Sequence, residues 1–147
     1  LARGEAIEPL HLEAFLAPLR KEKRIVVADG LLLRFLRRWL PEASVIGLGE
    51  SLLATVEGRL GARDLYVVDA QIYNLDQDRL AARYDALRAA SGCHMNLDLQ
   101  RIAVPATGQG EWLLEGRAVE RIVVENRADR EAFAFSGKPV VHVAELA

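Results

Sequence analysis

Short runs of aliphatic and β-branched residues alternate along this chain with longer stretches of helical periodicity. Four of the runs are apolar on both faces, which is typical of strands buried in a parallel sheet. They span residues 24–28, 44–46, 65–68 and 121–124, and a last strand is expected at 139–143. Helical spacing predicts helices over 9–23, 31–40, 50–60, from 74 or 76 to 90, and near 128–135.

A different pattern follows the fourth helix. From Cys93 to Gln100 apolar and polar residues alternate one by one, which predicts a strand with one polar face. Residues 101–104 continue that strand, 105–110 form a loop, and 111–114 form a short returning strand. The pattern therefore predicts a β-hairpin insert near residues 93–116.

Strands that alternate with helices pair in parallel through crossover connections. The chain is therefore expected to form an α/β fold, a three-layer Rossmann-like sandwich with a mainly parallel sheet of five to six strands. All 147 residues are taken as a single domain. Because the chain opens on Leu1 and closes directly after an apolar run, the alternative is a fragment of a longer polypeptide.

Composition narrows the class of protein. Hydrophobic residues make up 51% and charged residues 27%, which describes a globular domain and excludes a disordered one. A net charge of -2 argues against a nucleic-acid partner. No apolar run approaches the ~20 residues of a membrane span, so no membrane association is predicted. Cys93 is the only cysteine, and a reducing cytoplasm is the simplest compartment.

Polar residues and glycines follow the predicted strands at the point where each one ends. The carboxyl ends of parallel strands share one edge of a sheet, and ligands bind there. The candidate ligand-binding residues at this edge are Asp29, Gly47, Gly49, Ser51, Asp69 and Asn126. The alternative is that these residues only cap helices and form turns, which every α/β domain needs.

The segment from Gly47 to Ser51 lies between a strand and a helix, as a phosphate-binding loop does. It predicts a site for a nucleotide or another small anion. The segment departs from the dinucleotide fingerprint, because Leu52 takes the place of the third glycine and Glu50 adds a negative charge. A tight turn is the alternative interpretation.

Three acidic residues also follow strands, and Mg²⁺ is a candidate cofactor for them. Asp29, Asp69 and Glu125 supply the carboxylate oxygens that Mg²⁺ prefers. Three separate helix caps are the alternative.

The residues from Ile122 to Asp129 form an apolar strand, then Glu-Asn-Arg-Ala-Asp at the start of a helix. This segment resembles the opening motif of a Toprim domain, in which Glu-Gly-x-x-Asp follows a strand. The resemblance implies a part in Mg²⁺-dependent nucleic-acid processing, with Glu125 at the metal. Asn126 replaces the glycine, and the Asp-x-Asp strand that follows later in the family is missing.

The helix over 31–40 is expected to bury Leu32, Phe35, Leu36, Trp39 and Leu40, and to expose Arg34, Arg37 and Arg38 to water.

Two classes of function remain open. The first is a small-ligand binding α/β domain. The second is a non-catalytic association module of a larger protein, with a partner chain or a second copy. No nucleophile with a base and a third orienting group can be assembled, so no reaction type is predicted.

Overall fold

The computed structural model describes residues 8–98 and 109–147, and within them every strand pairs in parallel. The strands are β1 (Arg24–Val27), β2 (Ser44–Gly47), β3 (Asp64–Val67), β4 (His94–Met95), β5 (Arg121–Val124) and β6 (Val140–His142). The α-helices are α1 (Pro9–Leu19), α2 (Gly30–Trp39), α3 (Leu48–Val56), α4 (Ala70–Leu75), α5 (Gln77–Ser91), α6 (Gln109–Leu114) and α7 (Val143–Leu146). Three 3₁₀ segments are η1 (Glu57–Arg59), η2 (Asn96–Asp98) and η3 (Arg127–Ser136). The prediction of a mixed α/β fold with parallel strands is confirmed.

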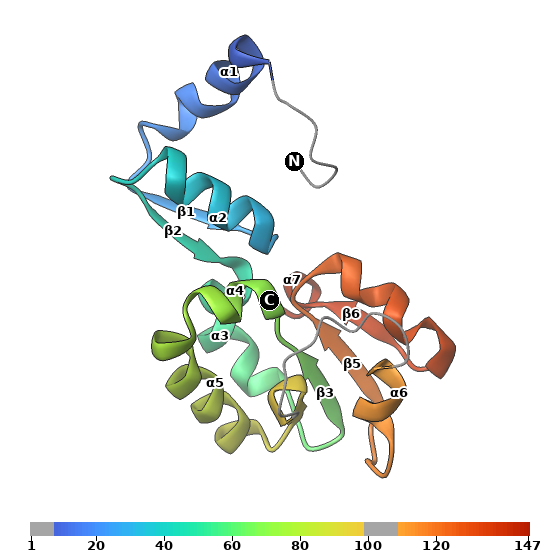
Figure 1. Ribbon diagram of the computed structural model, residues 1–147. Coiled ribbons are helices and arrows are strands. Elements are labelled where there is room, and N and C mark those ends of the chain that lie inside the picture. Colours follow the sequence, from blue (N-terminus) through green and yellow to red (C-terminus); the bar gives the residue numbers. More distant parts are fainter. Residues whose placement is uncertain (1–7, 99–108) are drawn as a thin grey trace.

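The strands lie in two sheets, so the prediction of one sheet with five to six strands is wrong. β1 pairs only with β2, and the other four follow the order β4-β3-β5-β6. Figure 1 shows α1, β1, α2 and β2 grouped at one end of the molecule, which we call the small lobe (residues 8–47). The large lobe (residues 48–98 and 109–147) holds the four-stranded sheet. One hydrophobic cluster contains side chains of both lobes, so they share a core.

Helices cover both faces of the large-lobe sheet. Side chains alternate in direction along each strand, so neighbouring residues of one strand pack against helices on opposite faces. Tyr66 and Val123 belong to the cluster that contains side chains of α3 and α5. Leu65 and Ile122 belong to a second cluster with Leu113 of α6 and residues of η3. The strands are therefore buried on both faces, as the apolar runs in the sequence predict.

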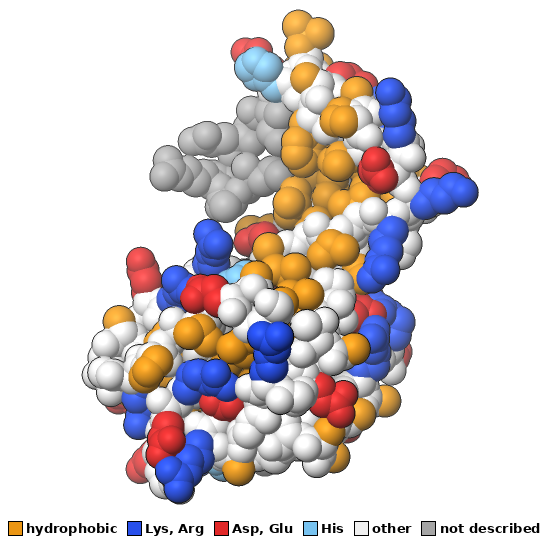
Figure 2. Space-filling view, turned by 180° about the vertical axis from the view of Figure 1, so that it is seen from behind, with side chains coloured by type: hydrophobic (Ala, Val, Ile, Leu, Met, Phe, Trp, Pro, Cys, Tyr) orange, Lys and Arg blue, Asp and Glu red, His pale blue; other side chains and the backbone are white. Residues whose placement is uncertain are grey.

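The small lobe leaves more apolar surface uncovered. Its two strands are too few to bury a face on each side, and Val26 of β1 is exposed. Figure 2, which views the molecule from the side opposite to Figure 1, shows hydrophobic side chains gathered on this lobe. Its exposed large hydrophobic residues are Leu10, Phe15, Val26, Leu31 and Trp39. Among the described residues, no helix has the length and apolar content needed to cross a membrane.

The β-hairpin insert near residues 93–116 is not formed in the described part of that segment. β4 pairs in parallel with β3, and residues 109–114 form the helix α6 instead of a returning strand. Leu113 is buried in α6 while Trp112 is exposed, a pattern that a short stretch satisfies as a helix or as a strand. The predicted strand at 101–104 lies outside the described residues.

The helix expected from residue 74 or 76 to residue 90 is confirmed as α5, which spans Gln77–Ser91 with Asp76 at its N-cap position. The short helix α4 before it, which Asp69 caps, was not predicted. The residues predicted to face inward, Leu80, Tyr84 and Leu87, are buried as expected. The tight turn expected at 47–49 is absent, since Gly47 is extended and α3 begins directly at Leu48.

Candidate functional site

The carboxyl ends of strands from both sheets meet at α4, which begins where β3 ends. A Cβ placed on Gly30, just after β1, would lie 3.2 Å from Oδ1 of Asp69. A Cβ on Gly47, at the end of β2, would press against the side chain of Ile72 in α4. The two lobes therefore bring their strand ends together at one place, which we call the strand-end junction.

Helix caps account for three of the predicted residues at this junction. Asp29 accepts hydrogen bonds from the first backbone N–H groups of α2, and Asp69 does the same for α4. Asn126 accepts one from the backbone N–H of Ala128 at the start of η3. These contacts stabilise the helices. The positive amino-terminal ends of α2 and α4 are therefore already next to carboxylates, those of Asp29 and Asp69.

Asp69 is also joined to the end of β5. Its backbone N–H donates to Oε2 of Glu125 at 2.8 Å, and Nδ2 of Asn126 donates to its Oδ2 at 3.0 Å. Three of the predicted residues, which are 56 and 57 positions apart along the chain, are thus held in one hydrogen-bonded group.

Glu125 is a buried carboxyl of this group. The hydroxyls of Tyr66 and Tyr84 donate to its Oε1 at 2.7 Å and 2.5 Å. Burial raises the pKa of Glu125 to about 7, against the lowering effect of these donors and of the Asp69 N–H. A Cβ on Gly49 would overlap the same carboxyl. Glycine is therefore needed in the first turn of α3 to admit Glu125.

Asp129 lies one turn further along, in η3. It is only 6% exposed, and among the described residues no group donates a hydrogen bond to its carboxyl. Burial, and after it the charge of nearby Asp69, raise the pKa of Asp129 to about 6. Asp129 is thus a largely buried carboxyl whose charge is repelled by that of Asp69.

Gly47, Gly49 and Ser51 do not form a loop that encloses an anion. The hydroxyl of Ser51 donates to the carbonyl of Leu48 within α3, at 2.8 Å. The Glu125 carboxyl lies against Gly49, where a phosphate would have been expected. The negative charge beside the start of α3 therefore belongs to the protein.

His142, at the end of β6, supports the junction from the other side. Its Nε2 donates to the carbonyl of Glu125 at 3.0 Å, while its Nδ1 accepts from the N–H of Ala144. Burial lowers the pKa of His142, which keeps the ring neutral and its Nε2 protonated. This histidine positions the backbone of Glu125.

No group of three or more His, Cys, Asp or Glu side chains within residues 8–98 and 109–147 is arranged to enclose a metal ion. Asp69 and Glu125 are joined by a hydrogen bond, whereas the Asp29 carboxyl accepts only from the start of α2 among the described residues. Mg²⁺ does not require a closed cage, because it commonly keeps several waters and takes only one or two protein carboxylates together with ligand phosphates.

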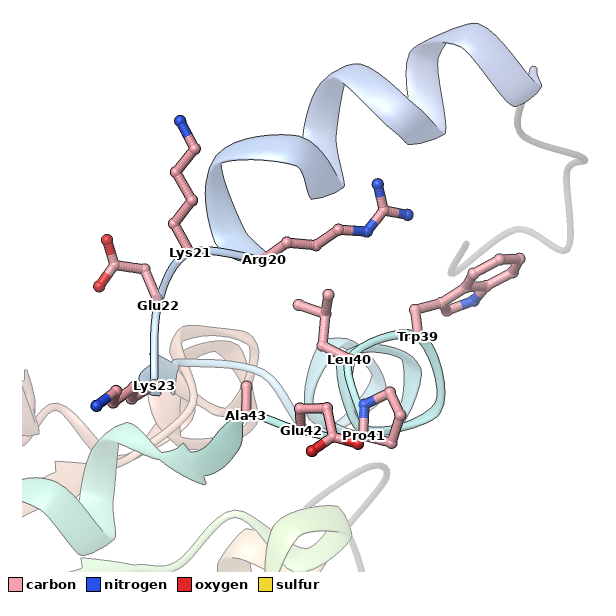
Figure 3. A pocket seen from close by; sticks show the side chains of 9 residues that line it. All are labelled: Arg20, Lys21, Glu22, Lys23, Trp39, Leu40, Pro41, Glu42 and Ala43. Carbon is pink, nitrogen blue, oxygen red and sulfur yellow. The ribbon is translucent and has the colours of Figure 1, made fainter.

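A shallow pocket of about 310 Å³ adjoins the junction. It lies between α2 and α4, and its lining residues are Gly30, Leu31, Arg34, Gln71, Asn74 and Leu75. A second pocket, of about 500 Å³, lies at the amino end of β1. Figure 3 shows that this pocket is formed by the link between α1 and β1 and by the end of α2. It is therefore remote from the strand-end junction.

Sequence reasoning did not place Asp129, Tyr66 and Tyr84 among the site residues. Asp129 had a signal, since it is the last residue of the segment that resembles a Toprim motif. The two tyrosines had none, because only the fold shows that hydroxyls from β3 and α5 meet at Glu125.

Comparison with known proteins found no matching family, no matching curated protein and no matching solved structure.

Proposed function

We propose that this chain binds a phosphate-bearing small ligand, such as a nucleotide, through Mg²⁺ at the strand-end junction. The observation that carries the proposal is the pair of largely buried carboxyls Asp69 and Asp129, whose negative charges repel each other. Buried carboxylates of this kind are costly unless a cation or a proton compensates their charge. A divalent cation between Asp69 and Asp129 would remove that cost.

The other residues of the junction support this assignment. Glu125 fixes the backbone of Asp69 through a 2.8 Å hydrogen bond, and Asn126 fixes its carboxyl. The helix starts already carry carboxylate caps, so a phosphate would be repelled unless a metal ion lay between. The pocket between α2 and α4 adds the amides of Gln71 and Asn74 for the remainder of the ligand.

Thermal unfolding with MgCl₂, ADP and pyrophosphate, alone and in combination, tests the proposal. ADP or pyrophosphate should raise the melting temperature only when Mg²⁺ is present. At a ligand concentration of ten times Kd the expected stabilisation is about 1.4 kcal/mol. Asp129→Asn should abolish the effect. Asp85→Asn is the matched control, because Asp85 is exposed and forms a surface ion pair with Arg88.

Two results would reject the proposal. One is a wild-type protein that shows no shift with Mg²⁺ and either phosphate compound. The other is an unchanged shift in a folded Asp129→Asn variant.

A second candidate is Mg²⁺-dependent nucleic-acid processing. The observation that favours it is the position of Glu125 at the end of β5, an inner strand, with Asp129 buried four residues later. This is the placement that the resemblance to a Toprim motif implies. Incubation of a short DNA duplex with the protein and Mg²⁺, followed by electrophoresis, tests it. Binding or cleavage that is lost in Asp129→Asn would favour nucleic acid over a free nucleotide.

A further inference from the structure

The outer face of α2 carries a row of apolar side chains that no described element covers fully. Leu31, Phe35 and Trp39 recur every four residues and so lie on one face of the helix. Leu31 is 44% and Trp39 43% exposed, and Phe35 is half-buried. The row continues onto α4, where Leu75 is 42% exposed.

A shallow pocket of about 450 Å³ opens along this row, and its described lining residues all belong to α2: Leu31, Arg34, Phe35, Arg38 and Trp39. It adjoins the pocket between α2 and α4, because Leu31 and Arg34 line both. We call the two together the α2–α4 groove. From Leu31 to Trp39 it is about 12 Å long, and α4 extends it, so that it matches two to three turns of a helix.

The charges of the groove have one sign. Arg34 and Arg38 line it, and no carboxylate among the described residues pairs with either. Arg37, on the neighbouring face of α2, differs because it forms a bidentate ion pair with Asp76. The groove thus combines an apolar floor with two available guanidinium groups.

We propose that the α2–α4 groove binds an acidic amphipathic helix of a partner protein. The apolar face of such a helix would cover Leu31, Phe35 and Trp39, and its carboxylates would pair with Arg34 and Arg38. A nucleic acid fits less well. Phe35 and Trp39 offer rings on which a base can stack, but a net charge of -2 disfavours a polyanion.

Tryptophan fluorescence tests this interaction without reference to the metal site, in buffer that contains EDTA. The chain has two tryptophans, so Trp112→Phe leaves Trp39 as the only one. The probes are a synthetic helical peptide with a leucine stripe flanked by glutamates, the same peptide with lysines for glutamates, and a scrambled version. The glutamate peptide should shift the Trp39 emission to shorter wavelength in a saturable way, and added salt should weaken it.

Charge reversal provides the decisive comparison. Arg34→Glu with Arg38→Glu should weaken the glutamate peptide at least tenfold and favour the lysine peptide. Arg59→Glu with Arg127→Glu is the control of equal charge change, and it should leave binding intact, since both arginines are exposed in the large lobe, outside the groove. The proposal is overturned if the glutamate peptide binds no better than the scrambled one, or if single-stranded DNA binds more tightly than the peptide.

Discussion

At the scale of single residues, Glu125 shows how the fold holds a carboxyl away from water. Its oxygens accept from Tyr66, Tyr84 and the backbone of Asp69, so three donors stabilise the charged form. These hydrogen bonds do not offset burial completely, because the pKa of Glu125 is still raised to about 7. The group therefore takes up a proton near neutral pH, and the stability of the protein depends on that proton.

The pH dependence of stability should report this group. In the unfolded chain the pKa of Glu125 is near 4.5, and in the folded protein it is about 7. Between these values the folded state binds more protons, so this group makes the protein less stable as pH rises through the window. From about pH 5 to pH 8, Glu125→Gln should gain about 2 kcal/mol of unfolding free energy relative to wild type.

Urea unfolding at each pH measures the difference. Glutamine can still accept the Asp69 N–H through its oxygen, and its amide can donate to the hydroxyls of Tyr66 and Tyr84. The variant is therefore expected to fold. Parallel stability curves for variant and wild type across this range would contradict the raised pKa.

At the scale of secondary structure elements, the junction is built from helix starts. α2 and α4 begin with aspartate caps, and α3 begins with Gly47 and no side-chain cap. The Glu125 carboxyl lies against the first turn of α3 instead, at Gly49. One carboxyl from β5 thus reaches the helix that follows β2, which ties α3 to the large-lobe sheet.

Gly49→Ala should destabilise the protein, although alanine normally favours a helix over glycine by about 1 kcal/mol. The new Cβ would overlap the Glu125 carboxyl, and overpacking of this kind costs about 1–3 kcal/mol. Gly58→Ala is the matched control, because no atom lies within 4 Å of a Cβ there. Thermal unfolding compares the two.

The partner of the clash can be identified by a double-mutant cycle. Glu125→Asp shortens the side chain, so it should cost less in the Gly49→Ala background than in wild type. Additive losses would place the clash elsewhere.

At the scale of the whole molecule, the arrangement of the lobes was the part that the sequence could not predict. The apolar runs identified β1, β2, β3 and β5, because strands buried on both faces need such runs. The polar residues after them were expected to share an edge, and Asp69, Glu125 and Asn126 do lie together. Whether they bind a ligand stays a prediction.

The division into two sheets has no local signature. β1 pairs with β2 in register from Arg24 and Ser44, and nothing in either run excludes pairing with β3. That choice depends on contacts distant in sequence. Asn96 gives an example, since it was expected on a polar strand face. Its side chain is buried and exchanges two hydrogen bonds with the backbone of Val68.

The side chain of Arg37 connects the two lobes through hydrogen bonds. The sequence pattern predicts that it lies on a solvated helix face with Arg34 and Arg38. Arg37 forms a bidentate pair with Asp76, at 2.7 Å for both nitrogens, and donates to the carbonyl of Val45 in β2. Asp76 lies between α4 and α5 in the large lobe. The prediction that Arg37 is solvated is therefore wrong.

Arg37→Met should loosen the small lobe selectively. The substitution leaves Asp76 with Arg79 as its partner and leaves the Val45 carbonyl without a side-chain donor, so a loss of about 1–3 kcal/mol is expected. Hydrogen exchange should accelerate in β1, α2 and β2 and stay slow in β3 and β5, because the large-lobe sheet keeps its own helices.

Arg38→Met is the control on the same helix, since Arg38 is exposed and pairs with no described carboxylate. Arg37→Lys should rescue little, because an ammonium group cannot form the bidentate pair that a guanidinium forms with Asp76. Equal acceleration of exchange in both lobes would mean that they unfold as one unit. The strand-end junction would then depend on the whole core rather than on this ion pair.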